Sequence, residues 1–422
     1  MKRWYLDRPV LSWALYDWAA AGFTTTVMAG FFPTFFRLYW SVGTDPTTTT
    51  FRLGLANGAA GLLIALLAPL LGAMADRSAR RKLLLLSFAA VGVLATGALH
   101  GVGRGNWQLA AGLFVAAIAG YSGSVVFYDA LLLRVAAPRD FNRVSAFGYA
   151  LGYLGGGLLF AFNVLMTEFP QWFGLHSAAE AVQFSFLTVA VWWLLFALPL
   201  AFNVSEGAAS GTPAGSLRRT LGVAFAELLA SVRKLRHDRP VWLFLLAYWL
   251  YIDGINTIVK MAVDYGMALG FDSGSLLKAL LLTQFVAFPA ALGFGWLGTR
   301  IGAQRAILIG LFVYLLVTAW AVYLHSIEQF FAMAVTVGLV QGGVQSLSRA
   351  LYGQFVPPGK SAEYFGFYNM TGKFGAVLGP LLVGVTAAVT GSSRAAIGAV
   401  AVQFLAGGIV LWRVPNPAAP RP

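Results

Sequence analysis

The sequence lacks cysteine entirely, and only 11% of its 422 residues are Asp, Glu, Lys or Arg. Without cysteine there can be no disulfide, no thiolate metal site and no cysteine nucleophile. The scarcity of charge, beside 59% hydrophobic residues and a mean hydropathy of +0.73, excludes a soluble globular protein. A surface in contact with water could not be covered by such a composition.

Patterns for catalysis and cofactor binding are also missing. The phosphate-binding motif G-x-x-x-x-G-K-[ST] does not occur, which excludes a P-loop ATPase. The 4 histidines lie outside the middle of the apolar runs, and no Ser, His and Asp cluster or metal-ligand spacing accompanies them. We therefore expect neither an enzyme nor a bound cofactor or metal.

The chain does contain many apolar runs, each long enough for the roughly 20 residues that cross a bilayer. Backbone polar groups in lipid must be satisfied internally, which favours helices over an open sheet. The runs predict an all-α membrane protein with twelve transmembrane helices. These lie near residues 10–39, 52–75, 82–101, 107–135, 142–167, 181–203, 240–266, 274–298, 304–324, 328–356, 362–390 and 393–413.

Basic residues outnumber acidic ones, 29 to 16, for a formal net charge of +13. They concentrate in alternate loops and at both ends of the chain, while the opposite loops hold only Arg37, Arg52, Arg104 and Arg394. The positive-inside rule therefore predicts a multi-pass protein of the cell inner membrane with both termini in the cytoplasm. Nucleic-acid binding is not expected, because the basic residues are not gathered on a soluble face.

Residues 204–239 form the one long polar interruption, which divides the chain into bundles at 1–203 and 240–422. The interruption opens with Ser, Gly and Pro, as a flexible linker does. Apolar residues then recur every 3 or 4 positions among Arg and Lys, which predicts an amphipathic helix on the lipid surface. A role of this helix in binding a partner stays open.

The two halves share landmarks that indicate an internal repeat. Trp13-Ala-Leu-Tyr-Asp17 in the first span matches Trp249-Leu-Tyr-Ile-Asp253 in the seventh. Parallel repeats of this kind place a ligand site at the interface of the halves, near the bilayer midplane. A transporter is thus the favoured class.

The loop after the second span resembles the signature of the major facilitator superfamily. It reads Gly72-Ala-Met-Ala-Asp76-Arg77-Ser-Ala-Arg80-Arg81-Lys82. Its copy in the second half, Gly295 to Arg305, has Thr299 at the carboxylate position. The resemblance implies that two six-helix bundles rock in alternating access, and that only the first copy carries a complete charged gate.

Further segments are similar to the autophagy-related vacuolar amino-acid effluxers of fungi and their bacterial relatives. The segments are Leu15-Tyr16-Asp17-Trp18-Ala19, Gly148 to Gly156, Gln345-Ser346-Leu347-Ser348-Arg349 and Phe365-Gly366-Phe367-Tyr368-Asn369-Met370. This resemblance covers essentially the whole chain. It implies the major facilitator fold and, from the fungal members, export of neutral amino acids.

Charged side chains inside spans cost about 2.5 to 3.5 kcal/mol each on insertion scales, so each requires a physical reason. Their near balance of sign favours internal pairing. The set consists of Asp17, Asp129, Arg134, Asp253, Lys260, Asp264, Lys278, Arg349 and Lys373.

Asp17 is a candidate proton carrier; the alternative is a fixed pair or a helix cap. A zwitterion could offer its ammonium to Asp17 and its carboxylate to Arg349 or Lys373, which would bridge the halves. In the alternative, Arg349 is fixed to Asp253 or to helix ends. Gln345, one turn from Arg349, suits either account.

Span seven carries a polar stripe at steps of 3 and 4, which faces either the central cavity or a neighbouring helix. Within it, the last two members are spaced to neutralise each other. The stripe consists of Asp253, Asn256, Thr257, Lys260 and Asp264.

The loop signature predicts a gate at the cytoplasmic rim. Asp76 is expected to accept hydrogen bonds from a helix N-terminus while Arg80 reaches Asp129; a purely topogenic role for the arginines is the alternative. The gating set is Gly72, Asp76, Arg77, Arg80, Arg81 and Asp129. Glycines spaced by four, including Gly148 and Gly379, predict close helix packing.

The sequence as a whole predicts a monomeric secondary active transporter of a small polar solute in the lipid bilayer. A neutral amino acid that is exported is the favoured substrate, with protons as the candidate coupling ion. The alternatives are a carrier of small organic anions and a membrane sensor or scaffold that does not transport.

Overall fold

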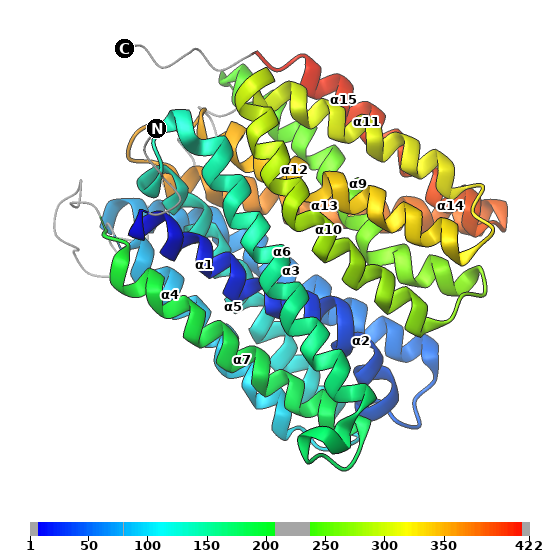
Figure 1. Cartoon of the computed structure of the whole chain (residues 1–422). Helices are drawn as coiled ribbons and strands as arrows, with labels where there is room; N and C mark the ends of the chain where they lie inside the picture. Colours follow the sequence, from blue (N-terminus) through cyan, green and yellow to red (C-terminus); the bar gives the residue numbers. More distant parts are fainter. Residues whose placement is uncertain (1–6, 79, 207–236, 416–422) are drawn as a thin grey trace.

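The computed structural model describes residues 7–78, 80–206 and 237–415, which form helices and short turns with no strand (Figure 1). The first half comprises α1 (Arg8–Gly22), η2 (Phe23–Phe31), α2 (Phe32–Phe35), η3 (Phe36–Trp40), α3 (Pro46–Ser78), α4 (Arg81–Ala98), η4 (Leu99–Gly101), α5 (Trp107–Val135), η5 (Pro138–Asp140), α6 (Phe141–Glu168), η6 (Pro170–Phe173) and α7 (Ala178–Asn203). The second half comprises α9 (Arg239–Ala268), α10 (Ser273–Ile301), α11 (Ala303–Ala321), α12 (Ile327–Gly353), α13 (Ser361–Thr390), α14 (Ser393–Gly398) and α15 (Ala401–Trp412).

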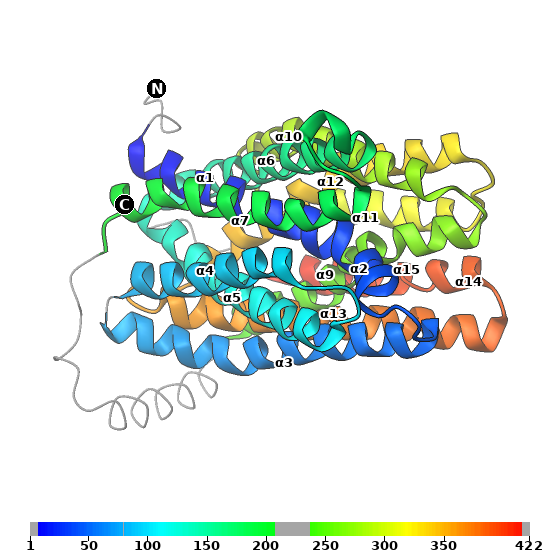
Figure 2. The ribbon, with the colours of Figure 1, turned by 90° about the horizontal axis from the view of Figure 1, so that it is seen from below.

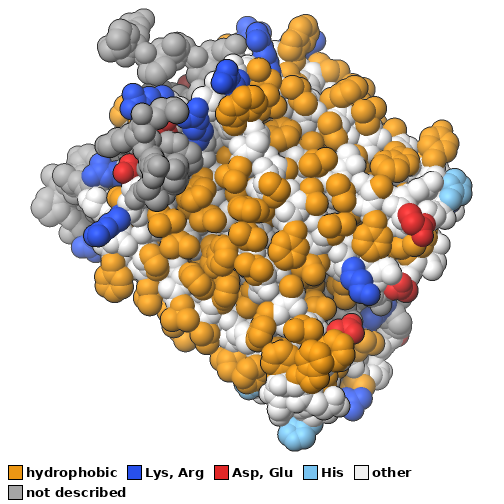
Figure 3. Space-filling model, viewed as in Figure 1, with side chains coloured by type: hydrophobic (Ala, Val, Ile, Leu, Met, Phe, Trp, Pro, Cys, Tyr) orange, Lys and Arg blue, Asp and Glu red, His pale blue; other side chains and the backbone are white. Residues whose placement is uncertain are grey.

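The described ranges contain twelve helical segments of membrane length. Among the described residues, 11 are long and apolar enough to cross a membrane, counting Arg8–Trp40 as one. The helix α13 has 30 residues, or about 45 Å at 1.5 Å per residue, and supplies the twelfth. Figure 3 shows a wide apolar surface with charged side chains gathered at its two ends, as a bilayer requires. The predicted fold class is confirmed.

The first and last spans depart from regular α-helix, which the apolar pattern of the sequence does not predict. η2 and η3 are π-helical, and Pro33, which lacks a backbone N–H, stands between them. The last span is interrupted by a turn at residues 399–400, between α14 and α15. The predicted amphipathic linker helix falls mainly on residues 207–236, which lie outside the described part of the chain.

The halves form two bundles whose most extensive contacts with each other lie along two pairs of helices. In the first bundle α1 packs on α6 and α7, and α4 packs on α5; in the second α12 packs on α10 and α11, and α9 on α13 and α15. Between the bundles α3 packs against α13 and α6 against α10. These two pairs lie at opposite sides of the molecule (Figure 2). We call the end at which α3 ends and α13 begins the basic end; α1 begins there and α15 ends there (Figure 1).

Glycines bring the backbones of α3 and α13 into direct contact. A Cβ at Gly72 would overlap the carbonyl oxygen of Ala362, and one at Gly366 would lie 2.7 Å from that of Ala68. Contacts this close admit only glycine at both positions. The bundles are therefore tightly apposed along this pair.

Candidate transport site

A buried ion-pair cluster joins the two bundles. The guanidinium of Arg349, on α12, lies 3.0 Å from the carboxylate of Asp129 on α5 and 3.5 Å from that of Asp17 on α1. The Arg349 side chain is 2% exposed and that of Asp129 5%, whereas Asp17 keeps 25%. We call these three residues the central charge cluster. By helix rise they lie roughly 6 to 14 Å from the basic end.

Neutral groups from both bundles complete the hydrogen bonding of the cluster. Ser145 on α6 accepts from Arg349 Nε at 2.9 Å through its hydroxyl and from Nη2 at 3.0 Å through its carbonyl. Asn369, on α13, donates its amide to Asp129 at 2.9 Å. Thus both Arg349 and Asn369 reach from the second bundle into the first.

Aromatic rings of the first bundle surround the guanidinium. The Arg349 Cζ atom lies 4.4 Å from the ring centroid of Tyr149, 4.8 Å from Trp13 and 5.2 Å from Tyr128. Tyr128 also donates its hydroxyl to Asp17 at 2.8 Å. Cation–π attraction is strongest where water is excluded, so these rings favour the closed arrangement of the bundles.

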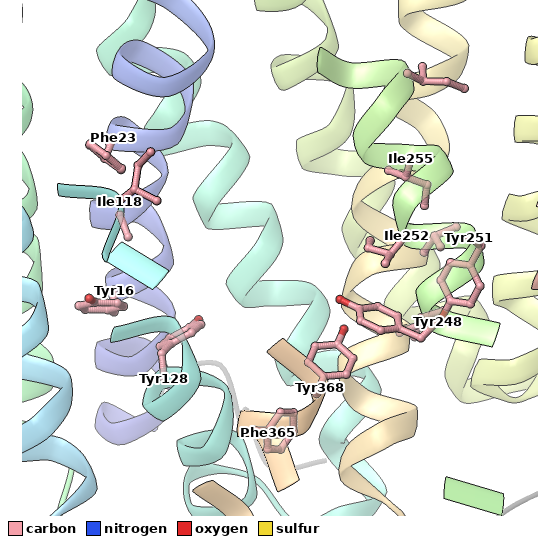
Figure 4. Close-up of a cluster of buried hydrophobic side chains, with 14 of the residues drawn as sticks. Tyr16, Phe23, Ile118, Tyr128, Tyr248, Tyr251, Ile252, Ile255, Phe365 and Tyr368 are labelled. Carbon is pink, nitrogen blue, oxygen red and sulfur yellow. The ribbon is translucent and has the colours of Figure 1, made fainter. Parts of the chain in front are cut away.

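A second aromatic layer lines the facing bundle. Figure 4 shows Tyr16 and Tyr128 on one side and Tyr248, Tyr251 and Tyr368 on the other. Tyr248 and Tyr368 stack with ring centroids 4.2 Å apart. The interior between the bundles therefore combines a few charges with many tyrosines, which suits a small amphipathic ligand better than a highly charged one.

The charges of the cluster do not balance. Two carboxylates share one guanidinium, so the cluster carries one excess negative charge whenever both are ionised. Separating the bundles removes Arg349 from both carboxylates at once. A cation, a proton or a ligand ammonium is then needed on the first bundle, and an anionic group on the second.

The predicted carboxylate acceptor at the gate has the expected geometry. Asp76, at the end of α3, accepts from the backbone N–H of Ala362 at 3.0 Å and of Glu363 at 2.8 Å, in the first turn of α13. Arg81 binds the same carboxylate at 2.8 Å. An anion at a helix N-terminus is favourable, so this contact ties the bundles together at the basic end.

Other predicted residues take varied positions. Gln345 accepts from the Tyr153 hydroxyl at 3.1 Å, another contact between bundles. The Lys373 ammonium lies 5.9 Å from the ring centroid of Tyr121. Asn256 is half-buried on α9. The side chains of Arg77, Lys260 and Asp264 lie outside the described part of the chain.

One expected pairing and one alternative pairing differ from the observed contacts. Arg80 does not reach Asp129, because Arg80 is exposed at the basic end while Asp129 binds Arg349 and Asn369. Nor is Arg349 fixed to Asp253, because Asp253 is buried inside the second bundle and bound by Gln403 of α15. Helix spacing gave the faces of the spans, but the rotation of one helix against another decides which faces meet.

Sequence reasoning missed the neutral members of the site. Neutral side chains in a span carry no charge penalty, so the sequence does not distinguish them from other span residues. These members are Ser145, Tyr128 and Asn369. Asn369 does lie in a segment quoted for the family resemblance, which was the one available hint.

Comparison with known proteins agrees with this architecture. The family profile described as "Vacuole effluxer Atg22 like" matches residues 38–141 and 136–421. A Bacillus subtilis protein named "Uncharacterized MFS-type transporter YxiO" is 34% identical over 410 residues, 96% of this chain and 94% of that protein. "Autophagy-related protein 22-1" of Aspergillus niger is 25% identical over 284 residues, which are 63% of this chain and 45% of the fungal protein.

Solved transporters share the fold at low identity. The human organic anion transporter MFSD10 has a TM-score of 0.72 at 17% identity, covering 96% of this chain and 99% of that one. The proton:xylose symporter XylE also has a TM-score of 0.72, at 11% identity, covering 98% and 96%. Since the family profile and the bacterial relative both extend over nearly the whole chain, the chain belongs to the Atg22-like vacuole effluxer family, a branch of the major facilitator superfamily of multi-pass membrane transporters.

Proposed function

We propose that the protein exports a neutral amino acid by alternating access and that the central charge cluster is where substrate and proton act. The observation that carries the proposal is the contact of Arg349, from one bundle, with Asp17 and Asp129 of the other. Opening the bundles exposes one positive and two negative groups on facing walls.

A zwitterion replaces the broken ion pairs with matched charges. Its carboxylate can bind Arg349 bidentately, and its ammonium can bind Asp17, the more exposed of the two aspartates. The surrounding Trp and Tyr rings favour the ammonium and an apolar side chain. In the closed state these charges are occupied by each other, so substrate is released as the bundles close.

The excess carboxylate supplies the coupling. When Arg349 leaves, a single ammonium cannot neutralise both Asp17 and Asp129, and a proton on one of them removes the remaining charge. Without substrate, Asp17 needs a proton of its own, which the ammonium of a bound substrate displaces, so proton and substrate exchange at Asp17. A proton gradient directed into the cell then drives export.

The orientation follows from charge. Placing the basic end in the cytoplasm satisfies the positive-inside rule and puts both termini there. The contacts of Asp76 and Arg349 then close the cytoplasmic side, and the bacterial relative supports a location in the cell inner membrane. The gating role belongs to Gly72, Asp76 and Arg81, which join α3 to α13.

A small organic anion is the second candidate. Arg349 and Lys373 supply two cations in the second bundle, and a structural neighbour is named as an organic anion transporter. An anion without an ammonium, however, leaves Asp17 and Asp129 uncompensated unless both bind protons. This difference separates the two candidates.

The test is counterflow of labelled neutral amino acids in liposomes, with and without an imposed proton gradient, beside Asp17→Asn. Gradient-driven accumulation that is lost in the variant supports the proposal. Exchange that does not depend on the gradient supports a carrier of amino acids that is not coupled to protons. Stronger transport of carboxylates that lack an ammonium supports the organic-anion candidate. An absence of flux for every solute favours a sensor or scaffold.

A further inference from the structure

Asp253 lies inside the second bundle, apart from the central charge cluster. Its helix, α9, packs on α13 and α15, and its carboxylate accepts a hydrogen bond from the side-chain amide of Gln403 on α15. Asp253 is 1% exposed and Gln403 7%. An ionisable side chain at this depth is expensive and is a candidate functional group.

The orientation of the Gln403 amide leaves its oxygen without a donor. Nε2 donates to Asp253 Oδ2, but no group within residues 7–78, 80–206 and 237–415 donates to Gln403 Oε1. An amide oxygen can only accept, and a buried acceptor without a donor is unfavourable. A Cβ at Gly254 would lie 3.3 Å from this oxygen, so Oε1 faces α9 beside Asp253.

We propose that Asp253 is a proton-binding site and that Gln403 recognises its protonated form. A protonated carboxyl group gains an O–H donor, which Oε1 can accept, while the other carboxyl oxygen keeps its hydrogen bond from Nε2. One proton thus gives acid and amide two complementary hydrogen bonds. The ionised carboxylate offers Gln403 only one of them.

Thr257, one turn further along α9, extends the site. Its hydroxyl is fully buried and has no hydrogen-bond partner among the described residues. A Cβ at Gly379 on α13 would overlap this hydroxyl and lie 3.2 Å from Asp253 Oδ1. Gly379 therefore leaves room for both oxygens on one side of α13.

Within the described part of the chain, the titratable groups nearest to the site lie on α9, α11 and α13. On α9 these are Tyr251, which is bonded to Ser348, and Lys260 and Asp264, whose side chains are outside the described part. On α13 the nearest in sequence to Gly379 is Lys373, which is half-buried. On α11, Tyr314 stacks on Phe404, and α15 carries none.

The internal repeat gives this site a counterpart. Asp17 Oδ2 lies 3.1 Å from a Cβ at Gly148 of the fifth span, as Asp253 Oδ1 lies 3.2 Å from one at Gly379 of the eleventh. Equivalent aspartates thus have different partners, an arginine in one bundle and an amide in the other. A role of this proton in transport rests on the proposed function, whereas the binding of the proton by Asp253 does not.

The test is infrared difference spectroscopy of the purified protein in lipid, titrated with pH in water and in D₂O. We expect the C=O band of a protonated carboxylic acid that shifts in D₂O, titrates, and is lost in Asp253→Asn. Asp17→Asn is the matched control and leaves this band in place. Gln403→Leu shifts the band to higher frequency, because the carboxyl group loses its hydrogen-bonded partner.

Three results overturn the assignment. The first is the absence of such a band at every pH at which the protein is folded, and the second is its persistence in Asp253→Asn. The third is its removal by sodium chloride but not by choline chloride, which indicates a metal-cation site. If the band behaves as expected but the protein transports no amino acid, the proton site is upheld and the proposed function is rejected. Loss of gradient-driven accumulation in Asp253→Asn, with exchange retained, supports both.

Discussion

The two bundles carry an aspartate at equivalent positions but give it different partners. In the first bundle, Asp17 meets Arg349 of the opposite bundle, so its contact exists only while the bundles are together. In the second, Asp253 meets Gln403 of its own bundle, so its contact survives their separation. The repeat supplies the position, and we expect the partner to decide whether an aspartate responds to movement between the bundles.

The basic end repeats this contrast. At one interface, the carboxylate of Asp76 accepts from two backbone N–H groups of α13 and binds Arg81. At the equivalent interface, the amide of Asn142 on α6 donates to the carbonyl of Gly298 on α10 at 3.0 Å. Charged and neutral contacts thus occupy related places, and we expect the charged ones to control opening.

The largest expected effect comes from Arg349→Met. Removing the guanidinium leaves Asp129 buried without its cation, which costs about 3 to 5 kcal/mol for a buried pair. We expect a lower Tm and complete loss of counterflow. Arg349→Met combined with Asp129→Leu should regain most of the stability but none of the transport. Recovery of flux in that double variant would show that the cluster is structural.

Next in size is Gly72→Leu, which places a side chain where α3 and α13 touch. The bundles cannot then close at the basic end, because the new Cβ would overlap the backbone of α13. Since the chain has no cysteine, spin labels on cysteines introduced at the exposed Arg139 and Gln354 report their separation alone. We expect a longer distance than in the parent.

Gly61→Leu is the control for this experiment, because Gly61 lies on the same helix and a Cβ there meets nothing within 4 Å. It should leave the distance unchanged. An unchanged distance in Gly72→Leu as well would mean that this contact does not hold the basic end closed.

Much of the fold and part of the site could be predicted from the sequence. Apolar runs locate the spans because lipid leaves the backbone few options, and the loop signature pointed to Asp76 at a helix N-terminus. The partners of Arg349 could not be derived in this way. Asp17 and Asp129 were known as intramembrane charges, but spacing along one helix does not specify its rotation toward another.

The π-helical stretches of the first span were equally out of reach. Apolar periodicity near 3.6 residues does not distinguish a helix that widens locally to i→i+5 hydrogen bonds. Pro33 marks the place of the irregularity in the sequence, but not its form.

Asp76→Asn is expected to have a smaller effect than Gly72→Leu. The amide keeps one acceptor for the N–H groups of α13 but loses the charge that interacts with Arg81 and the helix N-terminus, worth about 0.3 to 2 kcal/mol. The distance distribution between the labels should broaden toward the open form, and high salt should reduce the difference from the parent. Equal distributions at low salt would contradict a gating role for this carboxylate.

The smallest effect is expected from Asn142→Ala, at the neutral interface. The variant loses one amide hydrogen bond, a net contribution of about 0.5 to 1.5 kcal/mol, and leaves the Gly298 carbonyl to find another donor. We expect a slight shift of the same label distance and no dependence on salt, because no charge is involved. Together, Asp76→Asn and Asn142→Ala distinguish the effect of a charge from the effect of a neutral hydrogen bond between the bundles. If Asn142→Ala opens the basic end as far as Asp76→Asn does, then the number of contacts between bundles, and not the charge at one of them, sets the balance between closed and open forms.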